Sequence, residues 1–436
     1  MQKNAQRLRG SLTLPGDKSI SHRALLLAAL AQGRSVLHGL GTGDDVQRTA
    51  ACLRQLGVQI TQQADATHVA SPGFAGWKTP EATLDCGNSG TTMRLLLGIL
   101  AAHPDLTATL DGDASLRKRP MARVTGPLAA IGAVIASCEG RPPLTIVGQT
   151  LHGAIHDLPV ASAQVKSALL LAGLFANGET VVHEPLQSRD HTERMLTALG
   201  VRLQREDNRH TIVGQGPRAV LPPLGDFHVP GDPSSAAFAI VAALLHADAD
   251  VTVRHFSQNP TRIGFLNVLG RMGGHLQTRE PSTLAGEPVA DVRATSSQLI
   301  ATDIAEGEVP SLIDELPILA LAAATAAGTS HFCGLAELRV KESDRLAAVV
   351  RLLTCLGVPT QSGADWLTVV GMGESSRLRA NAGAFVPGLD HRMAMTAAIA
   401  NLVSPSALEI QGFAAAVGSS WPSFAADFLD LQNTAD

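Results

Sequence analysis

Two segments of the chain combine residue types that bind an anion with residue types that move a proton. The first, Lys18–Arg23 (KSISHR), places ammonium, hydroxyl and guanidinium groups directly before an apolar run. The second, Arg339–Arg345 (RVKESDR), is the densest charge run of the sequence. If a helix covers it, Lys341 and Arg345 share one face, and Glu342 also meets Arg345. This spacing predicts a cluster of cations with a carboxylate beside them.

Polar segments of similar form precede other apolar runs. In Asn88–Arg94 (NSGTTMR), Gly90 would let a ligand approach the backbone closely. Further donors stand in Leu116–Met121 (LRKRPM), Ser162–Lys166 (SAQVK), Ser188–Asp190 (SRD) and Asp390–Arg392 (DHR). Any one of these segments could be a solvated turn or a structural helix cap. The interpretation as binding segments therefore depends on their recurrence.

Acidic side chains are scarce beside these cations. The chief ones are Glu342 and Asp314, which is expected to cap the apolar helix that follows Leu312–Pro317 (LIDELP). The cations are Lys18, Arg23, Arg94, Arg119, Lys166, Lys341, Arg345 and Arg392. Their excess predicts a ligand set with several negative charges and one or two acid–base steps.

An internal repeat would position these groups. Six Ala/Leu-rich runs begin at Ser19, Asn88, Ser162, Ser234, Asp314 and Asp390, with 69, 74, 72, 80 and 76 residues between successive starts. Each begins with a residue type that caps helices, and each is apolar on all sides, which predicts six buried helices. Apolar-Gly pairs before strand-like runs, as in Leu56–Ile60 (LGVQI) and Leu199–Leu203 (LGVRL), recur with a similar period.

Six buried helices are too many for one small core, so we expect two domains with three repeats in each. The predicted boundaries give a first domain at 15–232 and a second at 1–14 plus 233–436. If the repeats pack alike, the helix N-termini of each domain emerge on one side. Two such faces closing on each other would form a site for a highly anionic ligand.

Composition excludes several classes of protein. The 436 residues carry 39 acidic and 34 basic side chains, a net charge of −5, which argues against a generally basic nucleic-acid binder. Apolar runs such as Ala236–Leu245 are too short to span a bilayer. Five scattered cysteines without a CxxC pair suggest free thiols in a reducing cytoplasm. Neither a Walker motif nor His/Cys spacing typical of a metal site occurs.

Taken in order, the motifs resemble the 5-enolpyruvylshikimate-3-phosphate synthase family (3-phosphoshikimate 1-carboxyvinyltransferases), and its class II subgroup in particular. The family pattern LPGDKS-x-SHR, N-x-GT-x-x-R, RxRPM, RVKESDR and DHR runs from Leu14 to Pro422. The resemblance implies an α/β fold with two similar domains, each built from three βαβαββ repeats around buried helices. It also implies a glyphosate target, because glyphosate competes with phosphoenolpyruvate in this family.

The family reaction joins shikimate 3-phosphate to phosphoenolpyruvate and releases phosphate, without metal or organic cofactor. By resemblance, the residues that hold shikimate 3-phosphate are Lys18, Ser19, Arg23, Ser162, Gln164, Ser188, Asp314 and Lys341. Those that hold phosphoenolpyruvate are Lys18, Gly90, Arg119, Gln164, Arg345 and Arg392. The catalytic residues implied are Asp314, Glu342 and Lys18. The implied partners are these small molecules only, with no nucleic acid or membrane, and the enzyme is expected to be a monomer.

The chain departs from the family pattern in three places. Many members have a lysine near Val417–Pro422 (VGSSWP), and Lys166 is one candidate for its replacement. Ala163 and Glu337 stand where some members have Ser and Asn. Two alternatives remain open: a UDP-N-acetylglucosamine 1-carboxyvinyltransferase, which typically has a Cys in the loop that matches Asp111–Met121, and a non-catalytic anion-binding repeat protein.

Overall fold

The chain forms two compact units, each with its own hydrophobic core. The computed structural model describes residues 7–284, 286–373, 378–380 and 383–433. Unit 1 comprises Met1–Asp17, Pro230–Thr283 and Pro288–Asp436, and unit 2 comprises Lys18–Val229 and Leu284–Glu287.

Unit 2 contains three four-stranded sheets of the same design. In each, the first pair of strands is parallel and the next two pairs are antiparallel. The sheets are β13 (Asp226–His228), β2 (Gln32–His38), β4 (Ala66–Pro72) and β3 (Gln59–Gln63); β5 (Leu84–Asp85), β6 (Thr107–Asp111), β8 (Arg141–Val147) and β7 (Val134–Cys138); and β9 (Ile155–Asp157), β10 (Glu179–His183), β12 (Arg209–Val213) and β11 (Leu203–Glu206).

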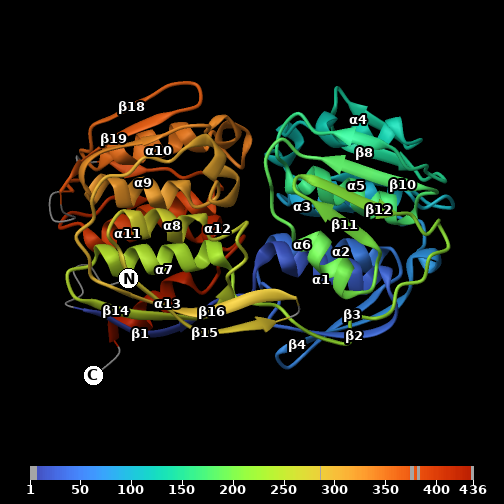
Figure 1. The fold of residues 1–436 in the computed structure, drawn as a ribbon, viewed down its shortest axis with the longest axis horizontal. Helices are drawn as coiled ribbons and strands as arrows, with labels where there is room; N and C mark the ends of the chain where they lie inside the picture. The colour runs from blue at the N-terminus through green and yellow to red at the C-terminus, as the bar shows by residue number, and fades with distance from the viewer. Residues whose placement is uncertain (1–6, 285, 374–377, 381–382, 434–436) are drawn as a thin grey trace. The chain divides into compact units, whose positions relative to one another are not determined.

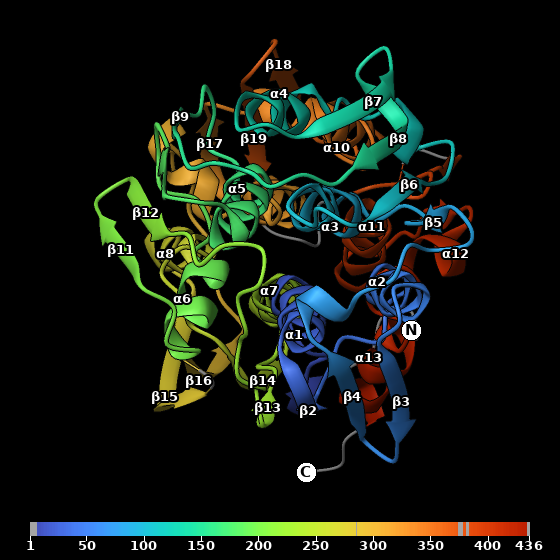
Figure 2. The same cartoon turned by 90° about the vertical axis from the view of Figure 1, so that its right-hand side faces the viewer.

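Three apolar helices fill the centre of unit 2, with the sheets around them (Figure 2). They are α1 (Lys18–Leu30), α3 (Gly90–Ala101) and α5 (Ala163–Phe175). Three further helices alternate with them along the chain: α2 (Asp44–Gln55), α4 (Ala122–Ala130) and α6 (His191–Ala198). The short 3₁₀ helices are η1 (Phe74–Gly76) and η2 (Leu116–Lys118).

Unit 1 also has three sheets, but among the described residues the second has three strands, all antiparallel, and the third has two. Its sheets are β1 (Leu8–Thr13), β14 (Ala249–Ser257), β16 (Glu287–Thr295) and β15 (His275–Leu284); β17 (Ala327–Phe332), β19 (Leu367–Met372) and β18 (Thr360–Ser362); and β20 (Ala384–Phe385) with β21 (Glu409–Ile410). In Figure 1, the helices α7 (Pro233–Leu245), α9 (Leu316–Thr325) and α11 (His391–Val403) lie together at the middle of this unit. The other helices are α8 (Gly264–Arg271), α10 (Arg345–Cys355), α12 (Phe413–Val417) and α13 (Phe424–Asn433), with 3₁₀ helices η3 (Glu306–Ser311) and η4 (Ala336–Val340).

The predicted fold class is confirmed. All six Ala/Leu-rich runs are helices, and most of their residues are buried because they are apolar on every side. Two of the predicted caps are also correct. Ser162 accepts a hydrogen bond from the amide of Val165, and Asp390 accepts from the amides of Arg392 and Met393.

The other predicted helix starts need correction. The N-cap of α3 is Ser89, one residue after Asn88, and α1 already begins at Lys18. A proline in the first turn displaces two further starts, because its fixed φ and missing amide suit that position. Pro233 makes Asp232 the N-cap of α7.

The most consequential correction concerns Asp314, which does not cap a helix. Pro317 occupies the first turn of α9, so the helix begins at Leu316 and its N-cap position falls on Glu315, whose side chain makes no cap bond. Asp314 instead lies in the turn before the helix, with its carboxylate available for other contacts.

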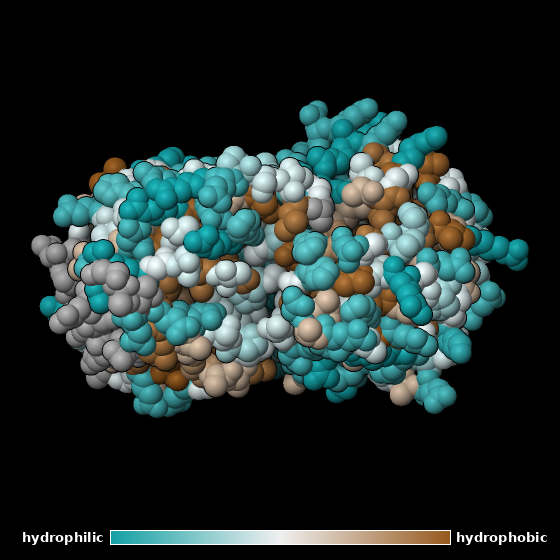
Figure 3. Space-filling view, turned by 90° about the horizontal axis from the view of Figure 1, so that it is seen from below, coloured by the Kyte–Doolittle hydropathy of each residue, from teal (hydrophilic) through white to brown (hydrophobic). Residues whose placement is uncertain are grey.

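Polar and apolar side chains are sorted as expected for two separate cores. On the face drawn in Figure 3, hydrophilic side chains dominate and hydrophobic ones are scattered among them. The large apolar residues gather in the clusters around α1, α3 and α5 and around α7, α9 and α11. Across the described ranges, no helix is both long and apolar enough to cross a membrane.

Candidate functional site

The start of α1 gathers hydroxyl groups around a buried guanidinium. Arg23 donates from Nε to Thr192 Oγ1 at 2.7 Å, from Nη2 to Ser167 Oγ at 2.7 Å and from Nη1 to the carbonyl of Ser19 at 2.9 Å. These three partners are neutral oxygen atoms. Lys18, the first residue of the same helix, instead forms an ion pair with Asp45 at 3.0 Å.

Arg189, which is not among the site residues expected from the motifs, also belongs to this group. Its Nη1 lies 3.5 Å from Ser19 Oγ. The available signal was its position next to Ser188 in the SRD segment. Ser188 donates its hydroxyl to Glu184 in a short hydrogen bond, and its amide also points to Glu184 at 3.4 Å. A ligand that binds Ser188 through its hydroxyl proton has to compete with this carboxylate.

Gln164 joins the starts of α5 and α3. Its Oε1 accepts from Arg94 Nη1 at 2.5 Å, and its Nε2 donates to Thr91 Oγ1 at 2.8 Å. The helices themselves pack together, with Gly98 of α3 against the backbone of Ala168. Gln164, Arg94 and Gly90 therefore belong to one polar group at the starts of α3 and α5.

Arg119 lies over the start of α3. Its Nη2 donates to Asn88 in a short hydrogen bond, and a Cβ placed on Gly90 would lie 3.2 Å from Arg119 Nη1. The Nε of Arg119 is buried and has no hydrogen-bond partner among the residues that the structure describes. A buried guanidinium donor without a partner costs free energy, so this atom suits an anionic ligand.

The structure argues against Lys166 as a substitute for the missing lysine, because its Nζ contacts Glu184, Glu193 and the carbonyl of Ser188. The side chain is fully buried, with its Nζ 2.6 Å from Glu184 and 2.8 Å from Glu193. His210 lies 3.4 Å from Glu184 and 3.3 Å from Glu193. Burial raises the pKa of Glu184, but its contacts with His210 and Lys166 outweigh this and lower it. Lys166 thus compensates buried carboxylates.

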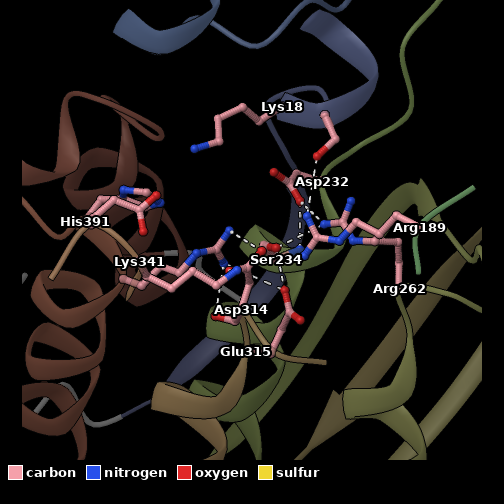
Figure 4. Close-up of polar contacts among 12 residues, drawn as sticks. Lys18, Arg189, Asp232, Ser234, Arg262, Asp314, Glu315, Lys341 and His391 are labelled. Carbon is pink, nitrogen blue, oxygen red and sulfur yellow. Dashed lines mark hydrogen bonds and ion pairs between the residues drawn. The ribbon is translucent and has the colours of Figure 1, made fainter. Parts of the chain in front are cut away.

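In unit 1, three cations surround the carboxylate of Asp314 (Figure 4). Arg345 Nη1 lies 3.1 Å from Oδ1, Lys341 Nζ lies 3.4 Å from the same oxygen, and Arg392 Nη2 lies 3.7 Å from Oδ2. Arg392 also donates to the Asp314 carbonyl at 3.2 Å. Opposite charges at these distances favour the ionised carboxylate, which is the form that can accept a proton.

Arg345 connects this carboxylate to two others. It is fully buried and contacts Asp314, Glu342 and, through Nε at 3.0 Å, Asp390. Burial alone would lower the pKa of Arg345, but the charges of Asp390, Glu342 and Asp314 raise it overall. Its side chain therefore stays a cation that holds three carboxylates in fixed positions.

Two expectations about the site charges need correction: the shared helix face in the RVKESDR segment, and the scarcity of carboxylates. Asp344 is the N-cap of α10, with its carboxylate accepting from the amide of Ala347 at 3.0 Å, so the helix begins at Arg345. Lys341 precedes the helix and shares no helix face with Arg345, although both reach Asp314. The expected scarcity of carboxylates is also wrong, because Asp390 and Asp45 pair with site cations.

One group within the described ranges has the spacing of a metal site: Asp190, His191 and Glu287, all in unit 2. Its ligand atoms are already engaged. Arg194 and Arg205 lie 2.9 Å and 3.1 Å from the Asp190 carboxylate, and His191 Nδ1 is 2.7 Å from Glu287. Two guanidinium groups supply the positive charge there, so the residues fit an ion-pair cluster better than a cation site.

Comparison with known proteins places the chain in a family. The EPSP synthase family, described as EPSP synthase (3-phosphoshikimate 1-carboxyvinyltransferase), matches residues 2–428. The 3-phosphoshikimate 1-carboxyvinyltransferase of Synechococcus sp. (strain RCC307) is 47% identical over 438 residues, covering 98% of both chains. The enzyme of that name from Thermus thermophilus is 47% identical, covering 93% of this chain and 92% of its own.

Solved structures agree. An EPSP synthase from Acinetobacter baumannii superposes with a TM-score of 0.84 at 40% identity, covering 98% of this chain and 95% of that one. The enolpyruvyl transferase NikO from Streptomyces tendae, at 18% identity and a TM-score of 0.76, shares the fold. On these sequence matches, over nearly its whole length, the chain belongs to the EPSP synthase family.

Proposed function

We propose that this protein transfers the enolpyruvyl group of phosphoenolpyruvate to the 5-hydroxyl of shikimate 3-phosphate, in the shikimate pathway to chorismate and the aromatic amino acids. The observation that carries the proposal is the likeness to 3-phosphoshikimate 1-carboxyvinyltransferases over nearly the whole chain. The carboxylate of Asp314 among three cations supports it, because the reaction needs a base beside several negative charges.

Resemblance to the family assigns a set of residues to each substrate. Shikimate 3-phosphate is held by Lys18, Ser19, Arg23, Ser162, Gln164, Ser188, Asp314 and Lys341. Phosphoenolpyruvate is held by Lys18, Gly90, Arg119, Gln164, Arg345 and Arg392. The buried Nε of Arg119 supports the second set, and the neutral partners of Arg23 support the first. To this first set we add Arg189, because its guanidinium reaches Ser19.

The chemistry is an addition followed by an elimination. Asp314 takes the proton of the 5-hydroxyl of shikimate 3-phosphate. The oxygen of that hydroxyl bonds to C2 of phosphoenolpyruvate, and C3 gains a proton. The tetrahedral intermediate then loses a proton from C3 and expels phosphate, which restores the double bond. Glu342 and Lys18 handle the protons at C3 and at the phosphate. Arg345 fixes Glu342 and Asp314 relative to each other.

Three further properties complete the proposal. The enzyme is a cytoplasmic monomer that acts on small molecules without nucleic acid or membrane. We assign its domains to 15–232 and 1–14 plus 233–436, bounds that differ by three residues from the unit crossings at 17/18 and 229/230. The five unpaired cysteines support the cytoplasmic location, because thiols persist in a reducing compartment.

The test is phosphate release with each acceptor. We expect release from phosphoenolpyruvate only when shikimate 3-phosphate is present, and loss of release in Asp314→Asn. Release that requires UDP-N-acetylglucosamine would favour the other carboxyvinyltransferase. Binding of shikimate 3-phosphate without any turnover would favour a non-catalytic anion-binding protein.

A further inference from the structure

Two of the places where the polypeptide passes from one unit to the other are 17/18 and 229/230, and the segments beside these two crossings are hydrogen-bonded to each other. The amide of Asp17 donates to the Pro230 carbonyl at 2.7 Å, and the amide of Asp232 donates to the Pro15 carbonyl at 3.1 Å. Gly16 and Gly231 form the bridge between them. In unit 1 the two segments therefore behave as one short two-stranded element.

A buried arginine binds the side chains of both segments. Arg262, in the loop before α8, lies 2.5 Å from Asp17 through Nη1 and 3.1 Å from Asp232 through Nη2. Burial lowers the pKa of Arg262, but the charges of Asp17, Asp232 and Glu315 raise it more. The guanidinium therefore remains charged in the core of unit 1.

The same guanidinium is linked by hydrogen bonds to Glu315, the residue that follows Asp314. Its Nη2 donates to Ser234 Oγ at 3.0 Å, and Ser234 donates to Glu315 in a short hydrogen bond (Figure 4). Glu315 directly follows Asp314 and also lies 3.7 Å from Arg392 Nη1. The charge of Asp314 is itself one of those that stabilise charged Arg262, so the two groups interact electrostatically.

We propose that Arg262 is a positioning residue, which couples the backbone of the two crossings to the turn that carries Asp314. The planar guanidinium of Arg262 can couple these segments because its separate N–H groups bind Asp17, Asp232 and Ser234 at the same time. A lysine would keep the charge but could not satisfy all three partners in fixed directions. The proposal rests on the proposed function for its kinetic consequence, and on unit 1 alone for its structural one.

The kinetic test compares Arg262→Lys with Arg262→Met. In Arg262→Lys we expect kcat to fall about 10- to 100-fold, the scale for a misplaced catalytic group, with the pH profile unchanged. In Arg262→Met we expect a similar or larger fall. The acidic limb of its kcat profile should also move to higher pH, because removal of a nearby cation makes a carboxylate harder to ionise.

Arg293→Lys is the matched control. Arg293 forms a similar fork with Asp250, at 2.6 and 2.5 Å, but this pair joins β16 to β14 and contacts neither crossing. We expect its kcat to stay within about twofold of the wild type, as for a surface substitution. Ser234→Ala separates the two sets of contacts that Arg262 makes. It removes the hydrogen bonds that link Arg262 to Glu315 and should lower kcat, while Arg262 still binds Asp17 and Asp232.

Hydrogen exchange in the ligand-free protein tests the structural part without any turnover. In Arg262→Lys, the amides of Asp17 and Asp232 should exchange faster than in wild type, whereas in Ser234→Ala and Arg293→Lys they should not. Unchanged exchange at both amides, or a lower melting temperature with wild-type kcat, would overturn the proposal. If the wild type itself shows no turnover, the proposed function fails, and the exchange result still decides whether Arg262 holds the crossings.

Discussion

The arginines among the site residues have different hydrogen-bond and ion-pair partners in the two units. In unit 2, Arg23 and Arg119 contact neutral groups: hydroxyls, a carbonyl and the amide of Asn88. In unit 1, Arg345 contacts three carboxylates, and Arg392 lies beside Asp314. These two unit 2 arginines thus offer positive charge beside neutral donors and acceptors, and the unit 1 arginines stabilise carboxylates.

This difference separates binding from proton transfer. A phosphate that approaches Arg23 or Arg119 replaces hydrogen bonds to neutral oxygen atoms with bonds between opposite charges, which are stronger. An anion that approaches Arg345 has to compete with ion pairs already made in a buried place. We therefore expect the unit 2 residues to dominate substrate affinity and the unit 1 residues to dominate turnover.

The largest effect is expected in unit 1. Asp314→Asn should lower kcat by about 10²- to 10⁴-fold, the range for a lost general base, and change the affinity for shikimate 3-phosphate little. Because Asp314 caps no helix, the melting temperature should move little. The control is Asp303→Asn, an exposed aspartate of the same unit. A fall in stability with near-normal turnover would assign Asp314 a structural role instead.

The next effect tests whether unit 2 also depends on a buried ion cluster. Lys166→Met should lower the free energy of unfolding by about 3–5 kcal/mol, because it leaves Glu184 and Glu193 buried without their cation. Chemical denaturation measures this, with the more exposed Lys118→Met as the control. A change below about 1 kcal/mol would show that His210 alone compensates the two carboxylates.

The same cluster predicts a pH dependence. The pKa of Glu184 is lowered in the folded state, so its contribution to stability is present above the ordinary glutamate pKa and is lost as pH falls through the lower folded value. Wild-type stability should therefore fall on acidification below about pH 4.3. Lys166→Met should show a smaller fall in that range, since only the contacts of Glu184 with His210 and Ser188 remain to lower its pKa.

Arg119→Ala tests the binding role of unit 2. Loss of a charge-assisted contact worth about 2–4 kcal/mol should raise the KM for phosphoenolpyruvate about 30- to 1,000-fold. The KM for shikimate 3-phosphate should change much less. Arg117→Ala is the control, because Arg117 lies in the same segment but is exposed and pairs with Asp111. Equal effects on both substrates would contradict the assignment.

Local pattern was enough to predict the elements but not the contacts between distant segments. The six apolar helices follow from uniform burial, and Ser162 and Asp390 follow from capping chemistry. The cap predicted at Asp314 is wrong because Pro317 lies in the first turn of α9, a position that proline favours, and so sets the helix start at Leu316. The position of this proline is visible in the sequence alone.

Pairing and burial of the cations could not be predicted in the same way. Lys166 follows Gln164 by two residues, yet the amide joins a polar group while the ammonium lies inside the core. Arg345 meets Asp390 across 45 residues, and Lys18 meets Asp45 across 27. Such pairs depend on how the repeats pack, and a single sequence carries no local signal for them.

The smallest effect is expected at Gly90, where one added methyl group tests the space beside Arg94 and Arg119. A Cβ there would lie 2.7 Å from Arg94 Nη1 and 3.2 Å from Arg119 Nη1, both at the ends of flexible side chains. The guanidinium groups can move aside, so Gly90→Ala should fold normally. The displacement of Arg119 should weaken the binding of anions that lie against it by about 1–3 kcal/mol, the usual cost of overpacking.

Glyphosate sharpens this last test, because resemblance to the family implies that it competes with phosphoenolpyruvate. The wild type should be inhibited measurably, but less than members that have the C-terminal lysine absent from Val417–Pro422. Gly90→Ala should raise the glyphosate inhibition constant more than the KM for phosphoenolpyruvate, since the methyl group penalises the longer ligand more. Gly126→Ala, where a Cβ would meet nothing within 4 Å, is the control. Gly90→Ala could instead change the glyphosate inhibition constant and the KM for phosphoenolpyruvate by the same factor. Gly90 would then not line the part of the site that only the inhibitor occupies. The group formed by Gly90, Arg94 and Arg119 would bind only the part of the structure that glyphosate and phosphoenolpyruvate have in common.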